Sequence, residues 1–418
     1  MPDTLTTILE CSDCGLVQRA GLAGTRRALR CGRCDGDLPG GPVVQRRLAA
    51  CATAGAALLL LIAFQEPVFD MHLAGRFATA GLLSGPRVLV ARGLPELALV
   101  VVSTLLLAPL AHLSILSLSL VGSWLRAPRR FLFLPLGLLE STRHWSMGDV
   151  YLLGALVCYV RLRDWGRVEI GSAVAALIAL RLVTIAADKA LDPSELWQRI
   201  PWTRPAARAD ARRAVPYVAC AWCKLVNAAA EGEPCARCGR TLRARKRNSL
   251  ARTGALLLTA GCLTVPANAL PVMEMIRFGR FETDTIYSGV VELVHHDLWG
   301  LAIVIFVASI VIPLIKVVVL GLLLWTTSQQ RTGYLLLRTR AFRFVHYVGR
   351  WSMVDVFAVT LLVSLVHVGV LASVLPRYGA VAFCAVVVLT MWATDAFDPR
   401  LMWDAAGQNG PEKQRRLR

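Results

Sequence analysis

Long apolar stretches alternate with short polar and basic segments over most of the chain. Each stretch approaches the roughly 20 apolar residues that a helix needs to cross a hydrocarbon layer about 30 Å thick. The pattern predicts eight membrane-spanning helices, four in each half, of which the third and fourth in each half are short. The predicted spans begin near Leu48, Leu94, Val150, Val168, Thr253, Leu298, Val354 and Gly379.

The second half of the chain repeats the first half, string by string. The matched strings include Gly75-Arg76-Phe77 with Gly279-Arg280-Phe281, Ser84-Gly85 with Ser288-Gly289, Pro109 with Pro313, Trp145-Ser146-Met147 with Trp351-Ser352-Met353, and Asp192-Pro193 with Asp398-Pro399. A duplicated membrane unit explains both this order and the apolar pattern. We therefore predict an all-α polytopic membrane protein built from two tandem repeats of four transmembrane helices.

The composition agrees with a membrane protein. Mean hydropathy is +0.54, and 56% of the 418 residues are hydrophobic, which is too apolar for a soluble chain of this length. Residues 1–45 are polar and contain no apolar h-region, so we expect no signal peptide.

Basic residues predict which side of the membrane the loops face. The Arg199–Arg252 loop is strongly basic, and further arginines lie in Leu125–His144, in Arg331–Arg350 and in the C-terminal tail. With eight spans these segments share one side, so the positive-inside rule places both termini in the cytoplasm. A smaller group of arginines around Arg163 falls on the opposite side, and the larger group decides the orientation.

The net charge of +18 follows from this orientation before any partner is needed. The arginines flank apolar segments, and contact with anionic lipid head groups is the next interpretation. Nucleic acid ranks last, so no nucleic-acid partner is predicted.

Eight of the 12 cysteines form four Cys-x2-Cys pairs, arranged in two sets. Two such knuckles bring four thiolates onto one ion, as in zinc ribbons and rubredoxins. We predict one structural zinc ion per set, two per chain, in a small rubredoxin-like ribbon before each membrane repeat. The ligand sets are Cys11, Cys14, Cys31 and Cys34, and Cys220, Cys223, Cys235 and Cys238.

Two other uses of these cysteines stay open. Disulfides are disfavoured because the cytoplasm keeps thiols reduced, and iron is the sharper alternative because it accepts the same ligands. Gly15, Gly32 and Gly239 are expected to give the knuckle turns their conformational freedom, and Arg33 and Arg237 to offset the charge of the thiolates.

These features divide the chain into five parts. The first ribbon occupies residues 1–45 and is followed by the first membrane repeat, residues 46–195. A linker and the second ribbon occupy residues 196–250, the second membrane repeat residues 251–404, and a basic tail residues 405–418.

Ionisable residues inside apolar spans are candidates for substrate or ion handling, because they are costly there. Lys316 follows Pro313 within a long apolar run, and its counterpart in the first copy is His112, which follows Pro109. The alternative for Lys316 is a side chain that snorkels to the cytoplasmic interface.

Four further polar residues join the candidate translocation set. Ser364 and His367 lie on one face of the seventh predicted span. Asp149 and Asp355 close the repeated Trp-Ser-Met-x-Asp string, in which local helix capping is a sufficient explanation for each copy alone. The strings of residues 70–92 and 274–297 are predicted to face outward as matched caps that suit contact with a partner.

The chain resembles the paraquat-inducible protein A family over nearly its whole length. The residues that carry the resemblance are the eight paired cysteines, Pro266-Ala-Asn268-x-x-Pro271, Pro313-x-x-Lys316, Trp351-Ser-Met-x-Asp-Val356 and Asp398-Pro399. The second copy follows the family pattern closely, whereas the first copy has Phe64-Gln65-Glu66-Pro67 in place of the Pro-Ala-Asn string. We therefore expect the second copy to carry any substrate chemistry.

The resemblance implies an inner-membrane subunit of a Gram-negative lipid transport system. Its implied partners are membrane lipids and a periplasm-spanning MCE-domain protein, for which it would handle or load phospholipid. Residue-level reasoning also leaves open a metal- or redox-sensing membrane protein with rubredoxin-like centres, and a passive scaffold for a periplasmic partner. An enzyme is not predicted, because the sequence contains no recognisable nucleophile–base set or open metal site.

Overall fold

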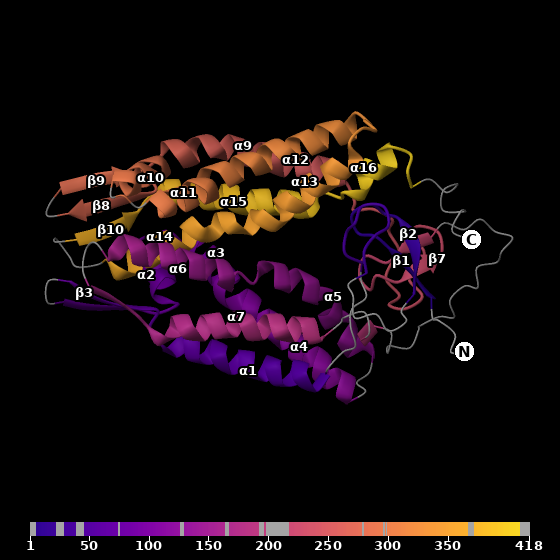
Figure 1. The fold of residues 1–418 in the computed structure, drawn as a ribbon, viewed down its shortest axis with the longest axis horizontal. Coiled ribbons are helices and arrows are strands. Elements are labelled where there is room, and N and C mark those ends of the chain that lie inside the picture. Colours follow the sequence, from indigo (N-terminus) through magenta and orange to yellow (C-terminus); the bar gives the residue numbers. More distant parts are fainter. Residues whose placement is uncertain are drawn as a thin grey trace.

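The computed structural model describes residues 6–21, 29–38, 46–73, 76–125, 129–163, 167–191, 196–197, 217–277, 280–295, 297, 299–366 and 372–409. Long helices run along the long axis of the molecule, as Figure 1 shows. Small sheets lie at one end, which we call the sheet end, and two cysteine-containing ribbons lie at the other, which we call the ribbon end.

Each ribbon is a short antiparallel hairpin followed by a second cysteine knuckle. Ribbon 1 (residues 6–38) contains β1 (Thr6–Glu10) and β2 (Val17–Gly21). Ribbon 2 (residues 217–242) contains β6 (Tyr217–Ala219) and β7 (Val226–Ala228). In both ribbons the first knuckle forms the turn between the strands, so the strand pairing holds that knuckle in place.

Repeat 1 (residues 46–191) begins with a long helix and a hairpin. Its first part contains α1 (Arg46–Gln65), β3 (Phe69–Leu73), β4 (Arg76–Ala80), α2 (Ser84–Ala91), α3 (Pro95–Val102) and α4 (Ala108–Trp124). Its second part contains α5 (Arg129–Trp145), α6 (Gly148–Leu162), β5 (Arg167–Ile170) and α7 (Ser172–Ala190).

Repeat 2 (residues 249–405) has the elements described for repeat 1 in the same order, together with the 3-10 helix η3 (Gly349–Met353) and a short final helix. Its first part contains α9 (Ser249–Ala269), β8 (Met273–Arg277), β9 (Arg280–Asp284), α10 (Ile286–His295), α11 (Trp299–Phe306) and α12 (Ile312–Ser328). Its second part contains α13 (Leu335–Val348), α14 (Val354–Leu365), β10 (Ala372–Pro376), α15 (Tyr378–Ala396) and α16 (Arg400–Ala405). The repeated sequence is therefore a repeated structure.

Both repeats widen a membrane helix at the same place. The single π-helical turns η1 (Ser103–Leu107) and η2 (Val307–Val311) join α3 to α4 and α11 to α12. Pro109 and Pro313 follow these turns, and a proline lacks the N–H group that a regular helix would use there. A π turn is one of the few ways in which a helix absorbs such an interruption.

Among the described residues, six helical segments are long and apolar enough to cross a membrane, whereas the sequence pattern predicted eight. The helix α6 has only 15 residues, and α7 carries Arg181, Asp188 and Lys189, which lower its apolar character. The protein is a multi-pass membrane protein with six segments that can span: Arg47–Gln65, Pro95–Gly122, Ser249–Ala269, Ala302–Ser328, Leu335–Leu365 and Tyr378–Ala396.

Although α7 falls short by composition, it occupies the same place in its repeat as a spanning helix does in the other. It packs along α1, just as α15 packs along α9. Two of its charged groups are used inside repeat 1, since Arg181 pairs with Asp149 and Asp188 with His112. Pairing of this kind lowers the cost of keeping charged side chains next to lipid.

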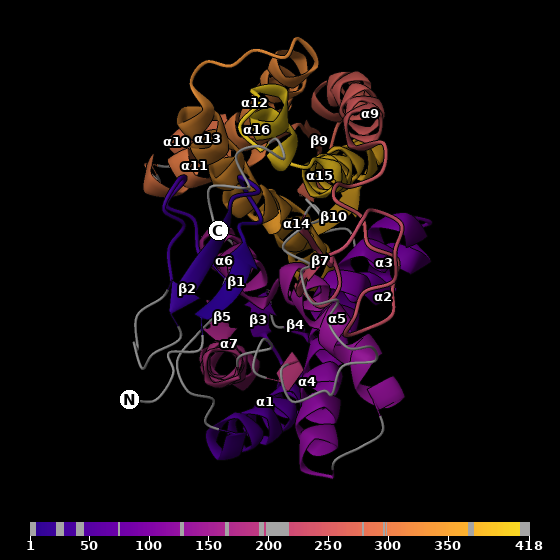
Figure 2. The same ribbon diagram turned by 90° about the vertical axis from the view of Figure 1, so that its right-hand side faces the viewer.

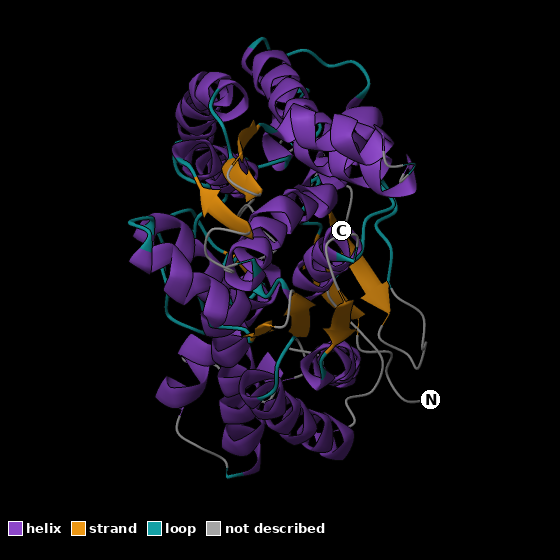
Figure 3. Cartoon of the chain, turned by 90° about the vertical axis from the view of Figure 1, so that its left-hand side faces the viewer, coloured by secondary structure: helices purple, strands orange, loops and turns teal. Residues whose placement is uncertain are grey.

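The sheet end holds two three-stranded antiparallel sheets, one in each repeat (Figure 3). In the first sheet β3 lies between β4 and β5, and in the second β8 lies between β9 and β10. The outer strands β5 and β10 come from the segment before the last long helix of each repeat. The all-α prediction therefore holds for the membrane part, and the two sheets add strands at the sheet end that the apolar pattern did not predict.

The two repeats meet along α6 and α14, near the centre of the molecule (Figure 2). Gly154 of α6 lies so close to α14 that an added Cβ would sit 3.0 Å from the carbonyl oxygen of Val354. Gly85 of α2 also faces α14, where an added Cβ would sit 2.7 Å from the carbonyl oxygen of Thr360. Small residues that let backbones approach closely are a usual basis of helix packing in membranes.

Candidate metal centres and membrane cavity

Each set of four cysteines closes into one cluster of free thiols. The shortest Sγ–Sγ distances are 3.5 Å for Cys11–Cys34, 3.5 Å for Cys14–Cys31, 3.5 Å for Cys220–Cys238 and 3.6 Å for Cys223–Cys235. A tetrahedral ion with metal–sulfur bonds of about 2.3 Å holds its ligands about 3.8 Å apart. Each cluster can therefore hold one metal ion with a small outward adjustment of its sulfurs.

A residue in the left-handed conformation ends each knuckle. Gly15 and Gly239 adopt φ values of 70° and 74°, as their residue type favours. Asp35 and Lys224 adopt 56° and 57° at the equivalent positions. Gly32, which the sequence analysis assigned to this purpose, is not among the residues with positive φ. The turn therefore does not require glycine in every knuckle.

The cluster of ribbon 1 receives a positive charge from repeat 2. Arg343 of α13 donates hydrogen bonds to Sγ and to the carbonyl oxygen of Cys34, each at 3.0 Å. The same guanidinium pairs with Asp13 at 2.6 Å. Arg33, the predicted source of compensating charge, instead donates to the Asn409 side chain at 2.7 Å. An arginine remote in sequence thus contacts the thiol of a candidate metal ligand directly.

Ribbon 1 docks on repeat 2, and not on the repeat that follows it in the chain. Its cysteines and Leu38 share one apolar cluster with Phe342, Val345 and Trp403 of repeat 2. The guanidinium of Arg33 lies over the Trp403 ring, 4.7 Å from its centroid.

Ribbon 2 docks on repeat 1 in the reciprocal way. The Trp222 indole N–H donates to the carbonyl oxygen of Phe133 at 2.9 Å, and its ring fills the space beside Gly137. Lys224 pairs with Glu140 at 3.1 Å. The two ribbons are therefore exchanged between the repeats.

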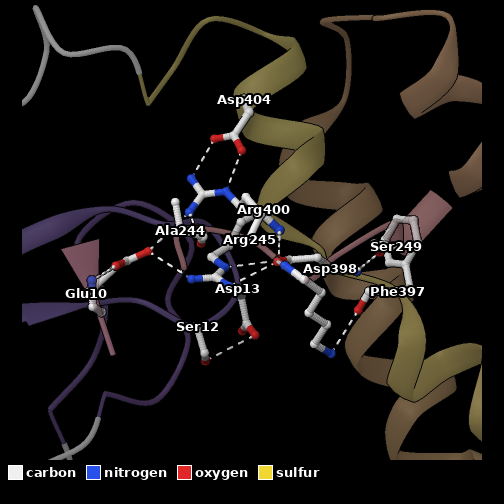
Figure 4. Close-up of polar contacts among 12 residues, drawn as sticks. Glu10, Ser12, Asp13, Ala244, Arg245, Ser249, Phe397, Asp398, Arg400 and Asp404 are labelled. Atoms are coloured by element: carbon white, nitrogen blue, oxygen red, sulfur yellow. Dashed lines mark hydrogen bonds and ion pairs between the residues drawn. The ribbon is translucent and has the colours of Figure 1, made fainter. Parts of the chain in front are cut away.

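Glu10, at the end of β1, ties both ribbons to the end of repeat 2 (Figure 4). Its carboxylate accepts hydrogen bonds from Arg400 and from the backbone N–H of Ala219, both at 3.1 Å. Arg245 lies 3.5 Å from the same carboxylate and also binds Asp404 through two nitrogens. Buried ion pairs with several hydrogen bonds each fix orientation well.

The repeated Asp-Pro string has a structural use in this network. Asp398 pairs with Arg400 at 2.9 Å and accepts from the backbone N–H of Lys246 at 3.1 Å. Burial alone would raise the pKa of Asp398, but the hydrogen bonds and charge of Arg400 hold that pKa below its ordinary value. The first-copy counterpart, Asp192, lies outside the described residues.

Lys316 is fully buried, so it does not snorkel to an interface. Its ammonium donates to the Thr390 hydroxyl of α15 at 3.0 Å, and its stem passes Gly349. His112 in repeat 1 is buried equally well and bonds to Asp188 of α7 at 2.9 Å. Both basic groups thus reach from the helix after the π turn to the last long helix of their own repeat.

A pocket between the repeats lies near the sheet end, since Val272, Met273 and Thr285 are among its lining residues. Its empty space, including the open mouth, is about 600 Å³. Repeat 1 contributes Leu97 and Val157, and repeat 2 contributes most of the remaining wall, including Leu362 and Phe383. Only Arg161, Thr285 and Asp355 place polar groups among the 14 lining residues. The pocket therefore combines a long apolar surface with one acidic and one basic side chain.

Asp355 and its counterpart Asp149 differ in their surroundings. Oδ2 of Asp355 is buried and makes no hydrogen bond within the described part of the chain. Oδ2 of Asp149 lies 3.3 Å from both Arg181 and Arg350, so that aspartate links the two repeats. The repeated string therefore gives a structural ion pair in repeat 1 and a pocket carboxylate in repeat 2.

The other predicted translocation residues do not gather at this pocket. The Ser364 hydroxyl donates to the Leu361 carbonyl oxygen within its own helix at 2.8 Å, and His367 lies outside the described residues. Lys316 and His112 are not among the residues that line the pocket.

Sequence reasoning missed three residues that the structure places at these sites. Arg161 lines the pocket, Thr390 accepts the Lys316 hydrogen bond, and Arg343 contacts Cys34. Arg161 is charged and its position was noted, but only as a signal of topology. A lone threonine or a basic residue on an amphipathic helix gives no comparable signal.

Three related proteins align with nearly the whole chain. It is 29% identical over 408 residues to the intermembrane transport protein PqiA of Escherichia coli K12, spanning 96% of this chain and 97% of that protein. It is 30% identical over 396 residues to the lipophilic envelope-spanning tunnel protein A of the same strain, spanning 94% and 91%. A probable intermembrane transport protein of Haemophilus influenzae is 27% identical over 416 residues, spanning 96% and 98%.

No solved structure matches the chain. The sequence pattern described as paraquat-inducible protein A matches twice, at residues 44–201 and 250–407. These two matches coincide with the two membrane repeats and together cover most of the chain. The protein therefore belongs to the paraquat-inducible protein A family.

Proposed function

We propose that the protein is an inner-membrane subunit of an intermembrane lipid transport system. In this function it handles or loads phospholipid for a periplasm-spanning MCE-domain partner. The proposal places transport, and not catalysis, at the centre of its activity. The printed names of its relatives, intermembrane transport protein and lipophilic envelope-spanning tunnel protein, support this class of function.

The pocket between the repeats is the observation that carries the proposal. A phospholipid has apolar chains and a charged head group, and the pocket offers apolar walls together with Arg161 and Asp355. A buried carboxylate oxygen without a protein partner is costly unless a ligand or water uses it. The pocket also lies between two repeats, where a relative movement of the repeats would change its shape.

The orientation of the molecule follows from the basic segments. We infer that the ribbon end and both termini lie in the cytoplasm and that the sheet end faces the periplasm. Arg245 and Arg343, which belong to the basic segments at residues 240–252 and 338–350, contact ribbon 1. The two sheets would then face a periplasmic partner, with the pocket close to them.

The metal in each ribbon is proposed to be zinc. Four thiolates in a closed tetrahedral set leave no open coordination position, which is typical of structural zinc. Bound zinc supplies folding energy to a domain that is too small to fold on its own core. Metal analysis of the purified protein tests this choice, because iron in place of zinc would favour the redox-sensing alternative.

Filling the pocket tests the transport proposal. Ala358 of α14 lines the pocket, and Ala358→Phe would occupy space that we assign to lipid. Ala255→Phe is the matched control, because Ala255 is exposed on α9. We expect the pocket variant, purified in detergent, to contain several-fold less phospholipid by mass spectrometry and to fail in supporting the outer-membrane barrier.

Zinc content serves as the test of folding for both variants. A variant that retains its metal but loses phospholipid supports the proposed pocket. If Ala358→Phe keeps both its phospholipid and full barrier function, the pocket is not the lipid site. That outcome would favour the passive-scaffold function instead.

A further inference from the structure

A cluster of three metal-ligating side chains lies outside the sites described above. His144 is near the end of α5, His346 near the end of α13, and Asp395 near the end of α15. The first belongs to repeat 1 and the other two to repeat 2. Among the described residues it is the one group of this kind that contains no cysteine.

The three ligand atoms form a triangle of the size that a metal ion requires. Nε2 of His144 and Nδ1 of His346 each lie 3.9 Å from the same oxygen, Oδ1 of Asp395, and all three atoms lie within 4.8 Å of one another. The point that is equally far from the three atoms lies no more than about 2.5 Å from each of them. Metal–nitrogen and metal–oxygen bonds are about 2.0–2.2 Å long. A small contraction would complete the coordination.

The two histidine rings are close neighbours and lie nearly parallel to each other. Their ring centroids lie 4.8 Å apart with an angle of 19° between the planes. Phe342 also stacks on His346, with centroids 6.1 Å apart. At 3.9 Å neither ring nitrogen is close enough to Asp395 for a hydrogen bond, which needs about 3.2 Å or less. The carboxylate and the nitrogens therefore face one another without satisfying one another.

The surroundings allow an ion to enter and stay. The three side chains are between 23% and 45% exposed, so water and ions can reach them. Lys246 is a neighbouring cation, but its ammonium donates to the carbonyl oxygens of Asp395 and Phe397. Asp13 of ribbon 1 pairs with Arg343 one helical turn before His346, so the charge of this nearby arginine is offset.

We propose that His144, His346 and Asp395 form a third metal site, which binds zinc or a similar divalent transition metal. Two imidazoles and one carboxylate suit zinc, whereas magnesium and calcium prefer all-oxygen ligand sets. With three protein ligands the site keeps an open position for water, unlike the closed cysteine clusters. An ion here would join repeat 1 to repeat 2 at the ribbon end and so hold the repeats together.

Zinc titration of the full-length protein tests the proposal. The protein is purified in detergent with its ribbons loaded, excess metal is removed, and zinc chloride is added in a calorimeter. We expect one further equivalent to bind to the wild-type protein. His144→Gln and His346→Gln should each weaken this binding at least ten-fold, because each removes one of three ligands.

The control is His295→Gln, since His295 is an exposed histidine at the sheet end. It should bind the further zinc like the wild-type protein. Zinc should also raise the thermal unfolding midpoint of the wild type and of His295→Gln, but not that of the two site variants. Ribbon zinc measured before titration shows that each variant is folded.

Cobalt gives an independent readout, because its absorption differs between thiolate and imidazole ligands. Cobalt added to ribbon-loaded protein should give d–d bands without thiolate charge-transfer bands, and His144→Gln should abolish them. The proposal is overturned if the wild type takes up no further equivalent, or if both site variants bind it as tightly as His295→Gln does.

Discussion

Lys316 shows at the scale of one residue how a costly group can be kept in a membrane helix. A charged lysine within a span costs about 2.5–3.5 kcal/mol on insertion scales. Here the side chain is buried and, among the described residues, has one hydrogen-bond partner, the Thr390 hydroxyl. That hydroxyl donates in turn to the Val387 carbonyl oxygen at 2.9 Å. Removing the ammonium would therefore leave no unsatisfied donor on Thr390.

We predict that Lys316→Leu folds normally and loses function. The thermal midpoint should be unchanged or higher, because an apolar side chain replaces a buried cation. Barrier function of the envelope should fall strongly if the ammonium serves transport. Lys316→Arg should keep partial activity, because it preserves the charge but not the compact head group.

The matched control is Lys189→Leu, since Lys189 is exposed on α7 and losing its charge should have no effect. Complementation assays at equal expression, with zinc content measured in parallel, provide the comparison. Full activity of Lys316→Leu would show that the lysine is dispensable and would favour the scaffold function.

The sequence predicted single residues well where their signal was local. Cysteine spacing brought together the correct four sulfurs in each ribbon, because a knuckle is built by neighbours in the chain. It gave no indication of Arg343 at Cys34, because that contact joins segments far apart in sequence. The sequence favoured Asp355 over Asp149 because the second copy follows the family pattern, but it gave no indication of the partners Arg181 and Arg350, which distinguish the two aspartates in the structure.

At the scale of the elements, one glycine position occurs in both copies, and each of its two glycines packs against the opposite repeat. Gly85 of α2 faces the backbone of Thr360 in repeat 2, and its counterpart Gly289 of α10 faces the Arg161 side chain of repeat 1. A Cβ at Gly85 would lie 2.7 Å from a backbone oxygen, whereas a Cβ at Gly289 would meet the mobile end of an arginine at 2.9 Å. The two positions should therefore differ in tolerance.

We predict that Gly85→Ala destabilises the protein by roughly 1–3 kcal/mol, because backbone atoms of α14 cannot move aside easily. Gly289→Ala should cost less, since Arg161 can rotate away. Gly261→Ala is the control: an added Cβ there meets nothing within 4 Å, and alanine favours a helix interior. Thermal unfolding in detergent measures all three, and equal midpoints for Gly85→Ala and Gly261→Ala would contradict the packing argument.

The elements themselves were only partly predictable. Apolar length identified α1, α9 and α15, but it overcounted spans where charges are neutralised within the protein, as on α7. The strands β5 and β10 are too short to give a clear alternating pattern, and they form because β3 and β8 offer free edges. Pairing with a distant strand is information that a local pattern does not contain.

At the scale of the whole molecule, the ribbons couple the two repeats. Ribbon 1 packs on α13 and α16 of repeat 2, and ribbon 2 packs on α5 of repeat 1. Duplication of the sequence does not reveal this exchange, because each ribbon could equally have covered the repeat that follows it. If each ribbon binds a metal ion as we propose, the ion in one ribbon would stabilise the opposite half of the membrane domain.

The docking of each ribbon on the opposite repeat leads to a prediction that is different for the two repeats. Replacing Cys11 and Cys14 together by serine should remove one of two zinc ions and unfold ribbon 1, because metal binding is folding energy in so small a unit. The apolar contact of the ribbon with Phe342 and Trp403 would then be lost. Amide hydrogen exchange should rise, by roughly ten-fold or more, in α13 and α16 before it rises in α5.

The reciprocal variant is the control for a general loss of stability. Replacing Cys220 and Cys223 by serine should release the contact of Trp222 with Phe133 and should increase exchange first in α5. Arg343→Ala should reproduce part of the first effect with both metal ions retained, since it breaks the pair with Asp13 and leaves all cysteines in place. If each cysteine variant instead loosened the repeat that follows its own ribbon, or both repeats equally, the exchanged docking would not govern the stability of the membrane domain.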